Sequence, residues 1–333
     1  MSKRKHLYIY AALSLALLIG LLALPWLVKS RYLIHIVIMT GIYAALALGY
    51  DLIAGHVGWL SLAHPTFFGV GGYVAALLST RVGTTFIVDF VVAGLVAALL
   101  AFLVSKPFFR LAGISFAIGT LGFALIMQLV ANNEIWLTNG PMCLAKVPRP
   151  LVSIPPLVTW HVSSMADYYY LMLAMLFLVV SLCSRLTTSR VGRTFMSIRE
   201  DEVLAAAAGV DPLKYKTLAF VIGALIAGSV GAYYVHYTTL ACPTDLSSYM
   251  TTVLLIILFL GGVGRMRGVM LGAIIFTFIP EFLRIAESLR MVIYGALLLV
   301  TVVYMPEGLD GVITKWLRHR RFGRSNQPQK GGE

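Results

Sequence analysis

A cluster of polar side chains interrupts one apolar stretch of this 333-residue chain. Within WLSLAHPTFFGVGGY, Pro65 cannot donate a backbone hydrogen bond and so frees a carbonyl, and Ser61, His64 and Thr66 supply polar groups beside it. Polar groups around a helix break are how membrane transporters build a passage or a gate. A histidine packed and satisfied among helices is the competing interpretation. Ser61, His64, Pro65 and Thr66 are therefore the candidate pathway residues.

A second polar feature is the basic stretch 185–216, which separates two membrane-length apolar runs. Thr194 to Ala208 should form a helix of about four turns. Gly209 suits the left-handed position that ends helices, because it tolerates a positive φ. Asp211 and Pro212 suit the N-cap and the first turn of the next helix. The pattern predicts a short helix isolated between two spans.

Small side chains gather at the end of this helix. Ala205, Ala206 and Gly209 would let the surface of another protein come close to the backbone. A membrane subunit needs such a contact surface if a separate soluble protein drives its movement. The alternative is a surface helix that rests on lipid.

Composition places the chain in a membrane. Hydrophobic residues make up 59% and charged residues 12%, about half the charge of an ordinary soluble domain. The sequence contains no GxxxxGK[ST] loop, no HExxH and no nucleophile elbow. We therefore expect a polytopic membrane protein that is not an enzyme and binds no cofactor, so that any ATP and Mg²⁺ would be bound by another chain.

Apolar runs of membrane length predict an all-α fold of about ten transmembrane helices. Residues 7–28 are long enough to span and are not followed by a small-residue cleavage site, so we expect a retained first helix. Residues 33–79 allow a second interpretation, one span followed by a broken or re-entrant helix. The predicted spans are 7–28, 33–53, 58–79, 85–105, 111–131, 168–184, 217–239, 249–264, 268–283 and 291–305.

Charge predicts the orientation. With the N-terminus in the cytoplasm and ten alternating spans, most of the 26 Lys and Arg residues fall inside, as the positive-inside rule requires. Both termini and residues 185–216 are then cytoplasmic, and residues 132–167 lie outside. The net charge of +12 follows from this topology and from anionic lipid, without a nucleic-acid partner.

Few ionisable residues accompany the spans. Asp51, Asp89 and Glu281 lie near predicted span ends, where a side chain can reach the membrane surface, whereas His64 and His236 are the two histidines of the central spans. A charge at membrane depth costs about 2.5–3.5 kcal/mol on insertion scales, so an unexplained one indicates function.

The cysteines have no metal-ligand spacing. Cys183 lies in a span, but Cys143 and Cys242 both fall on the predicted outer side. A disulfide is chemically allowed there, although the sequence gives no distance between them.

Two other segments have turn-forming composition. The proline-rich loop 132–167 favours a stiff, extended surface, either a solvated connector or a platform for an outside partner. The stretch 261–268, GGVGRMRG, predicts a tight cytoplasmic turn that offers a second contact for a soluble partner.

Several stretches together resemble the M-type membrane subunit of branched-chain amino-acid ABC importers. The resemblance covers roughly residues 35–312. It divides the chain into 1–32, an N-terminal tail and first span; 33–312, the permease domain; and 313–333, a basic cytoplasmic tail. The matching stretches are YDLIAGHVGWLSLAHPTFFGVGGY, GISFAIGTLGFALIMQLVANN, LTNGPMCLAKVPRP, VGRTFMSIREDEVLAAAAGVDPLKYKTLAF, LGGVGRMRGVMLGA and MPEGLDG.

The resemblance implies an assembly. In that family two related permeases pair in the bacterial inner membrane, two ATPases dock beneath them, and a periplasmic binding protein delivers amino acid. Glu202, Ala205, Ala206 and Gly209 match the coupling-helix motif. The implied ATPase-coupling residues are Arg193, Arg199, Glu200, Asp201, Glu202, Ala205, Ala206 and Gly209.

Some residues depart from the family pattern. Ala63, Pro65 and Cys143 replace expected small residues, and the stretch 265–267 is unusually basic. Related subunits carry urea or other small amides and acids, so that alternative stays open. An ion-coupled secondary transporter and a membrane-embedded enzyme are weaker alternatives, because neither explains the helix within 185–216.

Overall fold

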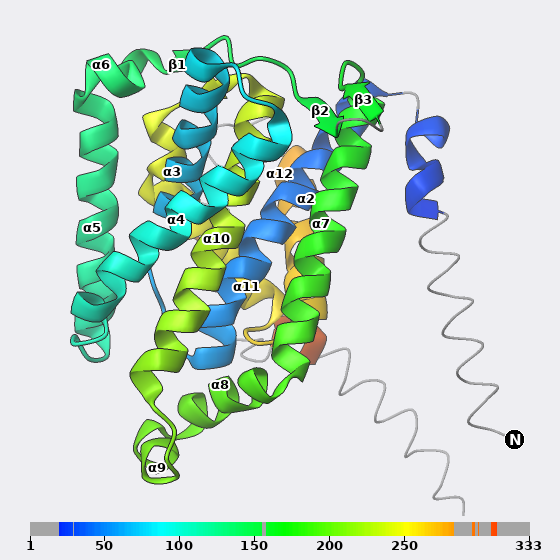
Figure 1. Ribbon diagram of the computed structural model, residues 1–333. Helices are drawn as coiled ribbons and strands as arrows, with labels where there is room; N and C mark the ends of the chain where they lie inside the picture. Colours follow the sequence, from blue (N-terminus) through cyan, green and yellow to red (C-terminus); the bar gives the residue numbers. More distant parts are fainter. Residues whose placement is uncertain are drawn as a thin grey trace, which may run out of the picture.

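The computed structural model describes residues 20–28, 30–154, 158–282, 295–296, 299 and 308–311. This part of the chain is a bundle of helices with short strands at one end (Figure 1). Five of its helices are long and apolar enough to cross a membrane, so the chain is a multi-pass membrane protein. They are α2 (Arg31–Asp51) with its π-helical continuation η1 (Leu52–Val57), α4 (Phe86–Phe108), α5 (Ile114–Asn133), α7 (Met165–Thr188) and α10 (Pro212–Thr238).

The apolar runs predict these helices to within a few residues. The five correspond to the predicted spans 33–53, 85–105, 111–131, 168–184 and 217–239, and the shorter α11 (Ser248–Gly261) and α12 (Met266–Phe282) correspond to 249–264 and 268–283. Residues 20–27 are helical within the predicted span 7–28. The rest of that span, most of span 291–305 and the tail 313–333 lie outside the described residues.

The predicted span 58–79 is interrupted. After η1 the backbone of residues 58–63 is not helical, and α3 (His64–Leu77) then begins and continues into π-helical η2 (Leu78–Val82). Gly58 ends η1 with a φ of 85°, which glycine adopts without strain. Of the two interpretations of residues 33–79, the structure therefore shows one span followed by a broken helix.

Helix α10 occupies the centre of the bundle, packed mainly against α3 and α4. Small residues make these contacts close. A Cβ atom added to Gly71 would lie 2.3 Å from the backbone of Gly228, and one added to Gly231 would lie 2.0 Å from the carbonyl oxygen of Phe68. The predicted use of small residues for close helix packing is confirmed at these positions.

The two ends of the bundle differ (Figure 1). One carries α8 (Arg190–Glu200) and α9 (Glu202–Ala207), which together we call the arm. The opposite, strand end carries α6 (Ile135–Thr138), η3 (Gly140–Met142), η4 (Pro243–Leu246) and the strands β1 (Leu144–Ala145), β2 (Leu151–Ile154), β3 (Val158–His161) and β4 (Leu240–Ala241).

The loop 132–167 is more ordered than its prolines predict. Strand β2 pairs antiparallel with β3, with Leu151 opposite His161, and β1 pairs with β4, with Leu144 opposite Ala241. The expected stiff, extended connector is thus a hairpin plus a strand that joins the loop to the far end of α10.

Candidate functional site

The arm begins with a capped helix. The Ser189 hydroxyl accepts hydrogen bonds from the backbone N–H groups of Val191 and Gly192, at 3.1 and 3.4 Å, and so satisfies donors that a helix start leaves free. Phe195 and Ile198 are buried against the bundle, one turn apart on the same face. The opposite face of α8, with Arg193 and Glu200, is exposed.

The prediction of one continuous helix over Thr194–Ala208 is wrong. Asp201 is extended, with φ −157°, and it ends α8 and starts α9. Its carboxylate accepts hydrogen bonds from the N–H groups of Val203 and Leu204, both at 2.9 Å. An aspartate that caps a new helix competes with continuation of the old one, and here the cap prevails.

The end of the arm matches the sequence prediction. Gly209 has a φ of 86°, its N–H donates to the Ala206 carbonyl, and the Val210 N–H donates to the Ala205 carbonyl. This is the left-handed ending that glycine favours. Asp211 is the N-cap of α10, and its carboxylate accepts the Lys214 N–H at 3.3 Å.

The small residues of the predicted contact surface differ in exposure. Ala206 and Gly209 are exposed, but Ala205 is buried against the protein. Two apolar side chains that the sequence analysis did not select, Val203 and Leu204, are 80% and 68% exposed. Their signal was two large apolar residues directly after the acidic run 200–202, within a polar stretch. Nothing in the described part of the chain covers them.

Arg199 attaches the arm to the bundle. Its guanidinium donates to the carbonyl oxygen of Gly55 in η1, 2.5 Å away. Asp51, one turn before Gly55, accepts the backbone N–H of Gly264 at 2.8 Å. We call Arg199, Gly55, Asp51 and Gly264 the inner junction, because they join α8, the end of α2 and the turn between α11 and α12. The stretch 261–268 forms that turn, as predicted.

Glu202 makes the second attachment. Its carboxylate lies 2.5 Å from Nζ of Lys216 on α10, and that ammonium group lies 3.7 Å from the centroid of the Trp59 ring. In a continuous helix Glu202 would lie one turn after Arg199 and could pair with it. Because the helix breaks at Asp201, Glu202 turns toward α10 instead, so its charge is already paired inside this chain.

A Glu202→Lys variant should loosen the arm, because it places a second cation beside buried Lys216. We expect a loss of about 1–3 kcal/mol of stability, less than for a fully buried pair because Glu202 is 43% exposed. Uptake should fall several-fold. For stability, Glu200→Lys is the control, since Glu200 is exposed and has no ion pair within the described chain.

Thermal unfolding in detergent and vesicle uptake measure both effects. The charge-swapped Glu202→Lys/Lys216→Glu protein should recover part of the stability. Equal stability of the Glu202 and Glu200 variants would show that the pair does not hold the arm.

The four candidate pathway residues lie together at the break before α3. Ser61, His64 and Thr66 are at most 1% exposed, and Pro65 is the second residue of the helix. The His64 ring stacks on Tyr50 of α2 with 5.0 Å between centroids. Within the described structure, His64 Nε2, Thr66 Oγ1 and the Tyr50 hydroxyl have no hydrogen-bond partner.

Hydroxyls from two other helices hold the broken segment. The Leu62 N–H donates to Thr120 of α5 at 3.0 Å, and the Leu62 carbonyl accepts from Thr251 of α11 at 3.3 Å. The Ser61 hydroxyl accepts the Ala63 N–H at 3.3 Å, so it is occupied locally. The break therefore touches α5 and α11 while its histidine faces α2.

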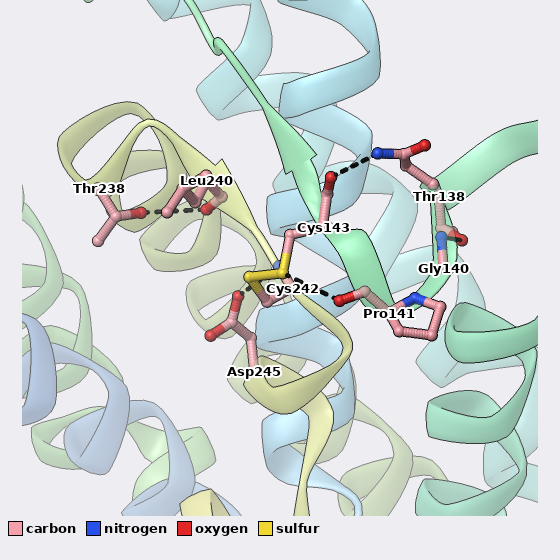
Figure 2. Close-up of a disulfide and its surroundings, with 9 residues drawn as sticks. Thr138, Gly140, Pro141, Cys143, Thr238, Leu240, Cys242 and Asp245 are labelled. Carbon is pink, nitrogen blue, oxygen red and sulfur yellow. Dashed lines mark hydrogen bonds between the residues drawn. A yellow bond between two sulfur atoms is a disulfide. The ribbon is translucent and has the colours of Figure 1, made fainter. Parts of the chain in front are cut away.

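A disulfide links Cys143 and Cys242 at the strand end, with 4.5 Å between the Cα atoms (Figure 2). Neighbouring Asp245 accepts the Cys242 N–H at 3.0 Å, and burial raises the pKa of this carboxyl to about 6. The sequence left open whether these two cysteines pair, and the structure shows that they do. It joins the long loop to the segment after α10.

Two of the three acids expected to reach the membrane surface, Asp51 and Asp89, are buried instead. Asp89 is inaccessible and lies 3.0 Å from Nε2 of His236, whose Nδ1 lies 2.9 Å from the Pro148 carbonyl. Asp51 is 1% exposed in the inner junction. Each acid therefore has a partner in the chain. The side chain of Glu281 lies outside the described residues.

The fold and the candidate site together define the class of protein. The protein is a multi-pass bundle with a polar break among its central helices and a capped arm at one end. Among the described residues, no group of three or more His, Cys, Asp and Glu side chains is placed to hold a metal ion.

Residues 32–302 match the family described as the permease component of branched-chain amino acid transport systems, and the chain belongs to that family. It is 31% identical over 314 residues to the high-affinity branched-chain amino acid transport permease LivM of Salmonella typhimurium, covering 89% of this chain and 73% of the relative. LivM of Escherichia coli is equally similar, at 31% over 313 residues.

A second high-affinity branched-chain amino acid transport permease, LivH, is also related. Escherichia coli LivH is 26% identical over 296 residues, covering 81% of this chain and 91% of the relative. No solved structure matches the chain.

Proposed function

We propose that this chain is the permease subunit of an ATP-driven importer and forms, with a sister permease, a pathway for branched-chain amino acids. The observation that carries the proposal is membership of the permease family over most of the chain, with relatives named as high-affinity branched-chain amino acid permeases. Similarity to both LivM and LivH supports pairing of two related permeases.

The remaining partners follow from this assignment. Two ABC ATPases bind ATP and Mg²⁺ and contact the arm, and a periplasmic binding protein delivers the amino acid to the strand end. The protein lies in a bacterial inner membrane, with ten spans and both termini in the cytoplasm. Two properties support the arm as the ATPase contact: it protrudes from the bundle, and it exposes Val203, Leu204 and Ala206.

The geometry suggests how closure of the ATPases would reach the pathway. Movement of the arm would pull on η1 through Arg199 and Gly55, and on α10 through Glu202 and Lys216. Both connections lead to the helices that enclose His64, which lies between α2 and α10. The chain itself supplies no chemistry in this mechanism, only two mechanical links and a polar site.

Copurification tests the assignment. A tagged chain extracted in mild detergent should bring down an ABC ATPase and a second permease, and vesicles containing the complex should take up leucine only with internal ATP. Uptake that persists without ATP but follows an ion gradient would replace the importer with a secondary transporter. Uptake of urea but not of leucine would retain the architecture and change the substrate.

Sidedness is a separate prediction. A cysteine placed at Ser189, beside the arm, and one placed at Ser153, in β2, should react from opposite faces of the membrane, Ser153 from outside. Membrane-impermeant maleimide on intact and on opened cells measures this. Reaction of both from the same face would contradict the ten-span orientation.

A further inference from the structure

A groove of about 430 Å³ opens on the outside of the bundle between α4 and α10, toward the arm end. Helix α4 crosses α10, and the two separate in this direction (Figure 1). The mechanism above uses no residue that lines the groove.

The wall of the groove is apolar and exposed. Phe102 of α4 is 54% exposed, and Leu213 and Leu218 of α10 are 42% and 37% exposed. Both helices are long and apolar enough to cross a membrane, so this wall faces hydrocarbon if nothing else covers it. A surface of this kind accommodates an acyl chain.

Positive charge marks the end of the groove. Lys106 lies in the last turn of α4 and Lys214 in the first turn of α10, and both are exposed lining residues. Neither ammonium group has a hydrogen bond or an ion pair within the described chain. The nearby acid, Asp211, is engaged by the N–H of Lys214 at the start of its own helix. The lining of the groove therefore contains two lysine ammonium groups and one carboxylate, and that carboxylate already accepts a backbone hydrogen bond.

We propose that this groove binds an anionic phospholipid. One acyl chain lies along Phe102, Leu218 and Val221, and the phosphate lies between Lys106 and Lys214 at the headgroup level. The charge complementarity selects an anionic over a zwitterionic lipid, because basic side chains at a membrane surface attract anionic headgroups. The inference requires membrane insertion, but it does not depend on the transport assignment.

Native mass spectrometry of the detergent-extracted full chain tests the proposal with palmitoyl-oleoyl phosphatidylglycerol and the matching phosphatidylcholine. Wild type should retain the phosphatidylglycerol preferentially. Lys106→Ala and Lys214→Ala should each lower its occupancy about fivefold. Leu218→Trp, which fills the groove and keeps both charges, should lower the binding of both lipids. Arg185→Ala, an exposed cation at the same end on α7, should change nothing.

Two results would overturn the proposal. Equal phosphatidylglycerol binding by wild type and both lysine variants would show that the groove does not select the headgroup. Cross-linking of Leu218→Cys to a second permease in native membranes, with no phosphatidylglycerol retained, would make the groove a subunit interface. Because the mutated side chains are exposed, the variants should fold, and size-exclusion chromatography verifies this.

Discussion

A Gly209→Asp variant should enter the membrane in nearly wild-type amounts and lose ATP-driven uptake. Gly209 has a φ of 86° at the exposed end of α9, and a Cβ atom there would meet nothing within 4 Å. The substitution should therefore destabilise the fold only through backbone strain, by about 1–2 kcal/mol. The carboxylate, however, would point into the surface that we propose as the ATPase contact. Retention of the ATPase should drop at least tenfold, which corresponds to about 1.4 kcal/mol of binding.

Gly83→Asp is the matched control. Gly83 has a φ of 74° and also has open space around its Cβ position, but it follows η2 at the far end of α3. The same residue change imposes the same kind of strain away from the arm, so it should leave ATPase retention at the wild-type level. If Gly209→Asp retains the ATPase and transports normally, the arm is a surface helix resting on lipid.

A His64→Leu variant should reduce uptake at least tenfold while the complex stays assembled. His64 is 1% exposed, and its Nε2 has no partner in the described structure. An unpaired buried polar atom costs about 1–3 kcal/mol, so leucine should not weaken the fold through lost bonds at this atom. What leucine removes is a polar group beside Tyr50 and Thr66 that passing solute or water would contact.

A Thr40→Val variant is the control for the His64→Leu variant, because it tests whether removal of any buried polar group lowers uptake. Thr40 is also buried on α2, but its hydroxyl bonds to the Ile36 carbonyl of the same helix. Its removal should leave uptake close to wild type. Vesicle uptake and the thermal midpoint are measured for both variants. Normal uptake by a stable His64→Leu protein would assign His64 to packing alone.

The membrane helices could be predicted because their signal is local. A run of about 20 apolar residues is enough to indicate a span, and α4 and α10 begin within a few residues of their predicted starts. The ending at Gly209 and the start at Asp211 were readable for the same reason, since each depends on one residue and its near neighbours. The capping role of Asp201 could not be predicted, because an acidic residue inside a helical pattern is equally compatible with a continuous helix.

Contacts between distant residues could not be read in this way. Glu202 and Arg199 are one turn apart in a continuous helix, but the break sends them to Lys216 and Gly55, neither of which the spacing indicates. Burial of Asp89 depends on His236, far away in the chain. Pro65, Ser61 and His64 did predict the broken helix. Its attachments to Thr120 and Thr251 emerged only from the structure.

The Cys143–Cys242 bridge also has a consequence for biogenesis. Its cysteines are 99 residues apart, and α7, α8, α9 and α10 lie between them. During synthesis the Cys242 thiol can reach the Cys143 thiol only after α7 and α10 have been inserted into the membrane. The strand end must also be exposed to an oxidant. The oxidised pair therefore indicates that insertion has proceeded through α10, whereas α11 and α12 follow Cys242 in the chain. A non-reducing gel of newly made chains would show when the bridge forms.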